Sequence, residues 1–106
     1  MERIQKILAP RVNRIEDGKT VTLENLDTGL VEIFEYDNES HDHLISYKAN
    51  DGRWQRIYRF DDGKAYRYED SSGIVEIIDY REGHIVHRKT DKYGHVEYWV
   101  EDYEDY

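Results

Sequence analysis

Short apolar segments separated by polar turns run through most of the chain. From residue 11 onward, segments rich in Val, Ile, Tyr and Trp alternate with clusters of Asp, Asn, Ser and Gly. This pattern is typical of β-strands joined by tight hairpin turns, and a glycine in nearly every turn supplies the positive φ that such turns need. The sequence predicts about nine strands, at Arg11–Ile15, Thr20–Asn25, Leu30–Tyr36, His43–Lys48, Arg53–Phe60, Lys64–Glu69, Ile74–Tyr80, His84–Lys89 and His95–Glu101.

The first ten residues follow a different pattern. Ile4, Ile7 and Leu8 recur at helical spacing, and Pro10 disfavours helix at the residue before it. We expect a short N-terminal helical turn there.

An internal repeat organises the rest of the chain. Gly29–Tyr36 reads GLVEIFEY, and Gly73–Tyr80 reads GIVEIIDY. The similarity extends to two halves of two hairpins each, at approximately residues 19–60 and 64–101. Such self-similarity is typical of a supersecondary unit that needs its neighbours to complete a core, so we expect one domain over residues 1–106.

The alternation within strands gives no cleanly apolar face. In the strand around Trp54, for example, Trp54, Arg56 and Tyr58 fall on one side, and Gln55 and Ile57 fall on the other. We therefore expect a strongly twisted all-β antiparallel meander whose two faces are each partly covered. A curved sheet, a barrel and a small sandwich all satisfy this pattern.

Composition and charge narrow the function classes. The 106 residues are 38% hydrophobic and 37% charged, carry a formal net charge of −9 and include no cysteine. A disulfide framework and a thiolate metal site are thereby excluded. The negative charge disfavours direct binding to nucleic acid or to an anionic membrane. With no apolar run of signal or membrane length, we expect a cytoplasmic protein without a cofactor.

Two segments carry a family resemblance. YRYEDSSGIVEIIDY (residues 66–80) and YKANDGRWQRIYRFDDG (residues 47–63) share a cadence of tyrosines, an acidic turn with glycine, and β-branched residues. This cadence resembles the YD-type repeats of polymorphic toxins and the MORN-like repeats of some antitoxin components. The resemblance covers residues 18–101 and implies an array of hairpins; it transfers no functional residues.

Catalytic and metal-binding patterns are lacking. The serines have no nucleophile-elbow motif, so we expect no enzyme activity. His84 and His87 are three residues apart on one predicted strand and would point to opposite faces, which disfavours a shared metal ion. Five bases on one predicted hairpin could contact nucleic acid, namely Arg53, Arg56, Arg59, Lys64 and Arg67. However, the alternation of side chains divides these bases between the two faces, and acidic residues on neighbouring strands can pair with them.

The end of the chain combines carboxylates with aromatic residues and contains no base after residue 96. Carboxylates on a rigid sheet can imitate the phosphates of nucleic acid, and tyrosines supply contact area at low entropic cost. The composition resembles that of phage and mobile-element inhibitors of the anti-CRISPR and anti-restriction type. We predict a non-enzymatic acidic binding protein that occupies a basic surface, such as that of a nucleic-acid-binding protein. Its predicted partner-binding residues are Glu97, Glu101, Asp102, Tyr103, Glu104, Asp105 and Tyr106.

Two other functions remain open at this stage. One is an antitoxin or immunity protein of the repeat type. The other is a carbohydrate or small-ligand binding β module with an aromatic platform of Trp54, Tyr58, Tyr66 and Tyr68. A third interpretation is that the acidic residues only make the protein soluble and have no binding role. The sequence does not determine the oligomeric state.

Overall fold

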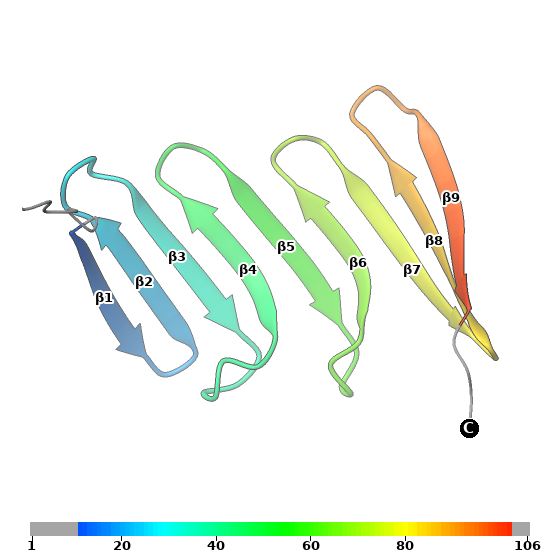
Figure 1. The fold of residues 1–106 in the computed structure, drawn as a ribbon, viewed down its shortest axis with the longest axis horizontal. Coiled ribbons are helices and arrows are strands. Elements are labelled where there is room, and N and C mark those ends of the chain that lie inside the picture. The colour runs from blue at the N-terminus through cyan, green and yellow to red at the C-terminus, as the bar shows by residue number, and fades with distance from the viewer. Residues whose placement is uncertain (1–10, 103–106) are drawn as a thin grey trace, which may run out of the picture.

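A computed structural model describes residues 11–102 of the chain. These residues form one antiparallel sheet of nine strands in which each strand pairs with the next along the chain (Figure 1). The strands are β1 (Val12–Asp17), β2 (Thr20–Asn25), β3 (Val31–Tyr36), β4 (Leu44–Ala49), β5 (Trp54–Arg59), β6 (Ala65–Asp70), β7 (Val75–Arg81), β8 (His84–Thr90) and β9 (Val96–Asp102).

The predicted all-β meander is confirmed, and each predicted strand forms with bounds that differ by at most two residues at either end. The glycines act at the turns as expected, since all seven have positive φ, from 59° at Gly18 to 99° at Gly52. The predicted helical turn around Ile4, Ile7 and Leu8 lies outside the described residues. Over residues 11–102 the structure has no helix, and so no helix long and apolar enough to cross a membrane.

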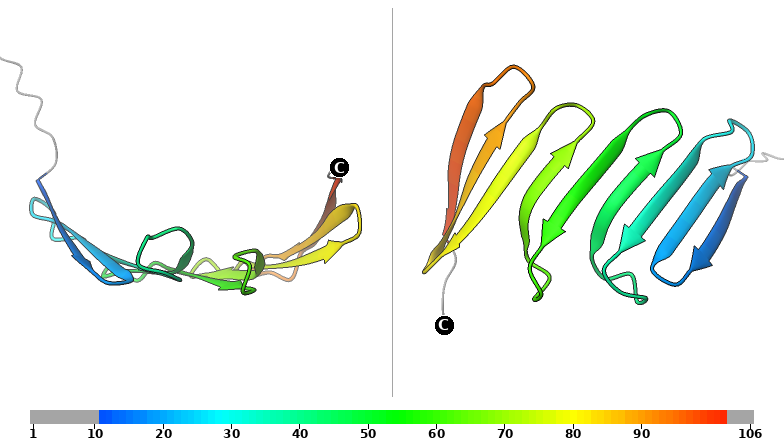
Figure 2. Two further views of the ribbon diagram at one scale, coloured as in Figure 1. Left: turned by 90° about the horizontal axis from the view of Figure 1, so that it is seen from below. Right: turned by 180° about the vertical axis from the view of Figure 1, so that it is seen from behind.

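The sheet is open, so of the three predicted architectures the curved sheet forms and the barrel and the sandwich do not. β1 and β9 lie at opposite edges, and no second layer covers either face within residues 11–102 (Figure 2). The expectation that both faces are partly covered is therefore wrong. The radius of gyration is 18.6 Å, against about 13 Å for a compact domain of this size. Each face carries too many charges to fold onto another sheet.

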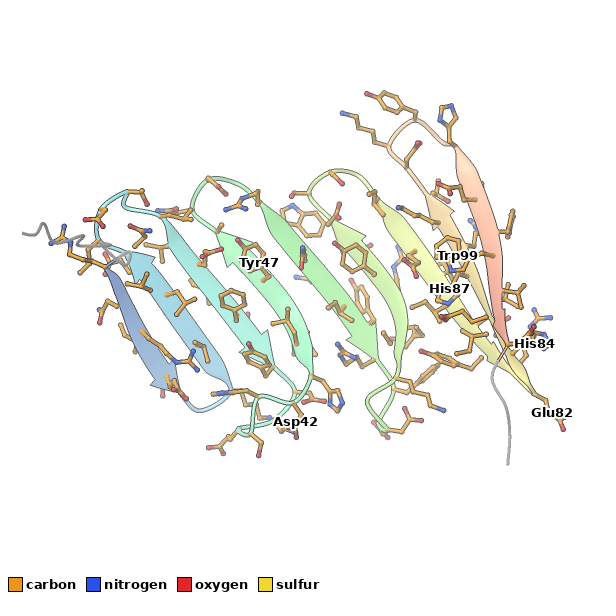
Figure 3. The ribbon with its side chains drawn as sticks, in the orientation of Figure 1. Asp42, Tyr47, Glu82, His84, His87 and Trp99 are labelled. Carbon is orange, nitrogen blue, oxygen red and sulfur yellow. The ribbon has the colours of Figure 1, made fainter. Side chains whose placement is uncertain are left out.

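The sheet curves along its length, and its concave face carries the best-packed residues. The left view of Figure 2 shows the curvature, and Figure 3 shows Tyr47, His87 and Trp99 on the concave face, which is turned to the viewer there. Val21, Phe34 and Tyr47 are direct neighbours across β2, β3 and β4, and the two rings lie 5.0 Å apart. Val21 at 3% exposure and Tyr47 at 8% are the only buried hydrophobic residues over residues 11–102. The core is thus a thin strip on the concave face.

Candidate functional site

The strand β9 is a free edge of the sheet. It pairs with β8 on one side and with no strand on the other in the described part of the chain. All seven of its residues are exposed. Of the features that commonly protect an edge strand from pairing with another chain, it lacks proline, lysine and a register shift, and its only charged side chains are carboxylates. Of the predicted partner-binding residues, Glu97, Glu101 and Asp102 lie on this strand.

The backbone of β9 alternates between β8 and solvent. The N–H of Asp91 donates to the carbonyl of His95 at 3.0 Å, which makes Thr90 and Val96 a non-hydrogen-bonded pair. By alternation, Glu97, Trp99 and Glu101 direct their N–H and C=O groups toward β8. The groups that point away from the sheet therefore belong to Val96, Tyr98, Val100 and Asp102.

The side chains of β9 also alternate. Trp99 is opposite His87, so Glu97, Trp99 and Glu101 lie on the concave face, and Val96, Tyr98 and Val100 lie on the convex face. Tyr98 is 69% exposed and Val100 is 56% exposed. The edge strand thus shows the carboxylates of Glu97 and Glu101 and an indole on one side, and on the other an apolar row that ends at Asp102.

The concave face as a whole is acidic. Alternation and register place Arg14, Arg59 and Lys89 on its strands, together with His87. They also place six carboxylates there, namely Glu16, Glu32, Asp70, Glu76, Glu97 and Glu101. Negative charge therefore extends from β9 across this face.

His87 connects β9 to the two strands before it. Its Nδ1 lies 3.0 Å from Oε2 of Glu76 on β7, and its Nε2 lies 2.7 Å from Oε2 of Glu101 on β9. The ring stacks on Trp99 at a centroid distance of 4.8 Å and an interplanar angle of 5°. Both nitrogens face carboxylates, and each must carry a proton to donate, so this arrangement holds the imidazolium form. We call His87, Glu76, Glu101 and Trp99 the His87 clasp; His87 and Trp99 are labelled in Figure 3.

The clasp changes the acid–base chemistry of the histidine. Burial by itself would lower the pKa of His87, but the hydrogen bonds to Glu76 and Glu101 outweigh it and raise the pKa above 6.5. The raised pKa extends the pH range over which the imidazolium is present, and its hydrogen bond holds Glu101 in place on an otherwise exposed strand.

An equivalent contact occurs in the first half of the repeat. Glu32 and Glu76 occupy the same place in the two matching octets. The Tyr47 hydroxyl donates to Oε2 of Glu32 at 2.5 Å, as His87 contacts Glu76. Sequence analysis missed both pairs. The pair of His87 and Glu76 could have been found from the short turn at Gly83. This turn pairs Arg81 with His84 and so fixes the register of β7 and β8.

The other predicted site residues are separated. Tyr103, Glu104, Asp105 and Tyr106 lie outside the described residues. The four aromatic residues of the predicted platform do not share one surface, because Trp54 and Tyr58 lie on the convex face and Tyr68 lies on the concave face. Tyr66 lies at a bulge of β6, where its ring is 4.7 Å from Phe60.

Most of the predicted basic cluster is engaged in local contacts. Arg53 pairs with Asp51 at 2.8 Å, and Arg67 pairs with Glu69 at 3.0 Å. Arg59 donates to backbone carbonyls of Leu44 and Gly63, and Lys64 lies 3.9 Å from Asp62. This leaves Arg56 without a hydrogen bond or ion pair among the described residues.

Two adjoining hollows lie on the convex face beside Arg56. Their volumes are about 340 and 290 Å³, and both are lined by Ser46, Lys48 and Arg56. Trp54 lines the larger hollow and Tyr58 the smaller. Lys48, like Arg56, makes no hydrogen bond or ion pair within residues 11–102. The side chain of Ser46 is small, and the longer side chains of Lys48 and Arg56 line the hollows around it.

The histidines do not assemble a metal site in the described part of the chain. His41 Nε2 contacts the carbonyl of Gly18 at 2.9 Å, and His43 Nδ1 contacts Asp37 at 2.9 Å. His84 and His87 lie on opposite faces, as expected. Over residues 11–102 no group of three or more potential ligands is placed to hold a metal ion.

Comparison with models of protein families, with curated proteins and with solved structures finds no match to this chain. The resemblance to YD-type and MORN-like repeats therefore stays a prediction. The function has to be argued from the edge strand and the faces of the sheet.

Proposed function

We propose that this chain is a non-enzymatic acidic binding protein that captures a positively charged surface of a partner protein through β9. The observation that supports the proposal is an edge strand that is exposed along its whole length and carries Glu97, Glu101 and Asp102 without a base. Unpaired backbone groups, together with the carboxylates of Glu97 and Asp102, which make no ion pair among the described residues, favour association with a basic protein segment. Basic surfaces of this kind are common in nucleic-acid-binding proteins, which would make the chain a competitor of nucleic acid.

The aromatic residues of β9 add contact area to this charge. Tyr98 and Trp99 are exposed by 69% and 37%, and Trp99 is held in position by the stacked His87. Large aromatic side chains with few rotatable bonds contribute strongly to binding because little entropy is lost on contact.

A matched pair of charge variants tests the proposal. Glu97→Lys combined with Asp102→Lys changes the net charge from −9 to −5 on β9. The control combines Glu24→Lys with Glu35→Lys, which makes the same change on β2 and β3. None of the four carboxylates makes a side-chain hydrogen bond or ion pair within the described residues. Both variants should keep the sheet, as checked by circular dichroism.

Affinity capture from a host lysate should recover a basic protein with the native chain and with the control variant, and lose it with the β9 variant. Capture should also weaken as the salt concentration rises from about 0.1 to 1 M, because the screening length falls from about 10 to 3 Å. Equal capture by all three proteins, or capture that is insensitive to salt, would exclude the acidic edge as the binding element.

The convex hollows favour a second candidate function, a small-ligand module. Trp54 would stack on a planar or sugar ring, and Lys48 and Arg56 would contact a polar or anionic group beside Glu69, which lines the same hollow. Trp54→Ala should then abolish binding in a screen of glycans and anionic metabolites while leaving capture by β9 unchanged. Ligand binding that survives Trp54→Ala would exclude this site.

A further inference from the structure

We infer that β9 holds its partner by strand addition, and that the accepted segment is an extended strand of alternating basic and apolar residues. This inference rests on the proposed function, because it specifies how the same edge strand binds a basic protein. Strand addition is a recognised mode of peptide binding in which main-chain hydrogen bonds give affinity and alternate side chains give specificity.

The backbone of β9 supplies the template. The N–H and C=O groups of Val96, Tyr98 and Val100 point away from the sheet and have no partner strand in the described part of the chain. A partner residue directly opposite Tyr98 or Val100 would exchange hydrogen bonds with it. Seven regular residues without a bulge provide room for such a segment.

The alternation of side chains determines the partner sequence. Partner residues opposite Tyr98 and Val100 would lie on the convex face, beside an apolar row, so Val, Ile or Tyr fits there. The residues between them would lie on the concave face, opposite Glu97, Trp99 and Glu101. Lys or Arg fits these positions because it meets a carboxylate or the face of the indole.

The His87 clasp prepares this template for binding. Glu101 is fixed by Nε2 of His87 at 2.7 Å, and the indole of Trp99 is stacked on the same ring. An edge strand that is already held in the extended conformation loses less entropy when a partner pairs with it.

A second copy of this chain is a poorer occupant than a basic protein. Pairing β9 with another β9 would bring Glu97, Glu101 and Asp102 of both copies together without a base. Pairing it with β1 of another copy would add the carboxylates of Glu16 and Asp17 and one base, Arg14, which already pairs with Glu16 at 3.0 Å. Like charges opposite one another destabilise a sheet.

Defined peptides separate strand addition from simple charge attraction. The first probe is the alternating peptide Lys-Val-Lys-Val-Lys-Val, and the second is Lys-Lys-Lys-Val-Val-Val, which has the same composition and charge. We expect the alternating peptide to bind the full chain at least about tenfold more tightly in fluorescence anisotropy. Methylation of the valine amides, which would face β9, should abolish that difference, whereas methylation of the lysine amides should not.

Proline variants on the two edges provide the protein-side test. Val100→Pro removes an outward N–H and no hydrogen bond to β8, so the sheet should remain intact. Arg14→Pro is the matched control, because the Arg14 N–H points outward from the opposite edge, β1. Val100→Pro should weaken binding of the alternating peptide at least about tenfold, and Arg14→Pro should leave it unchanged.

The outcomes distinguish this inference from the function on which it rests. Equal binding of the two peptides, lost only in the Glu97→Lys and Asp102→Lys variant, would overturn strand addition and retain the acidic binding protein. Binding of neither peptide would contradict both. A dimer that Val100→Pro dissociates would show that a second copy occupies β9, and would also overturn the inference.

Discussion

Replacement of His87 by alanine tests the clasp that fixes β9. The variant removes a hydrogen bond to Glu76, another to Glu101 and the stack on Trp99. His87 is 12% exposed and Glu76 is 22% exposed, so the first bond should contribute about 1.5 kcal/mol, the low end for a charged pair. Glu101 is 56% exposed, so its bond should contribute only about 0.2–1 kcal/mol. With about 0.5–1.5 kcal/mol for the stack, the total loss is about 2–4 kcal/mol.

The pH dependence of this loss follows from the raised pKa of His87. In the unfolded chain the histidine has its ordinary pKa of about 6.5. Below that pH the imidazolium is present in both states, and the clasp contributes fully. As the pH rises toward the folded pKa, the unfolded state loses its proton first, and the part of the contribution that depends on the imidazolium charge declines until it is lost above the folded pKa, which leaves the stack on Trp99. The difference between the native chain and His87→Ala should therefore be largest in mild acid and shrink at alkaline pH.

Urea denaturation across this pH range, followed by tryptophan fluorescence, measures the difference. His84→Ala is the matched control on the same strand, because His84 makes no side-chain hydrogen bond or ion pair among the described residues. A loss in His87→Ala that does not change with pH, or an equal loss in His84→Ala, would refute the clasp.

Two further substitutions test the turns and the concave strip. Gly73 has φ +91°, and an added Cβ would lie 2.4 Å from a lysine side chain, whereas Gly18 has φ +59° and open space around it. In thermal melts, Gly73→Ala should lower the free energy of unfolding by about 2–4 kcal/mol and Gly18→Ala by about 1 kcal/mol. Equal losses in the two variants would contradict the close approach of Gly73 to the lysine side chain. Tyr47→Phe should cost about 1–3 kcal/mol because the hydroxyl bond to Glu32 is lost. Tyr93→Phe, at an exposed side chain, should cost almost nothing; a similar loss would exclude a special role for Tyr47.

The strands could be predicted from the sequence because the turn chemistry is strong and local. Among the described residues, every positive φ except that of His41 belongs to a glycine, as at Gly18 and Gly83. The β-branched segments between the turns have little alternative to strand. Closure of the sheet could not be predicted in this way. Closure depends on whether one face of the sheet is apolar enough to pack against another layer. Strands such as Trp54–Arg59 carry apolar and charged residues on both faces, so the sequence does not decide this.

The candidate site was predicted only in part. The acidic character of Glu97, Glu101 and Asp102 is visible in the sequence, but their position on a free edge requires the strand order. The His87 clasp joins residues from three strands, so it depends on two registers at once. Both registers follow from the short turns at Glu82-Gly83 and at residues 91–95, which pair Ile78 with His87 and His87 with Trp99.

Amide hydrogen exchange along β9 tests most directly that this strand is a free edge. The amides of Glu97, Trp99 and Glu101 donate to β8 and should be protected, whereas those of Tyr98 and Val100 point outward and should exchange at nearly the rate of an unfolded chain. Addition of the alternating basic peptide should protect Tyr98 and Val100 as well. Uniform protection of all five amides in the isolated chain would show that another strand already covers this edge and would contradict the account.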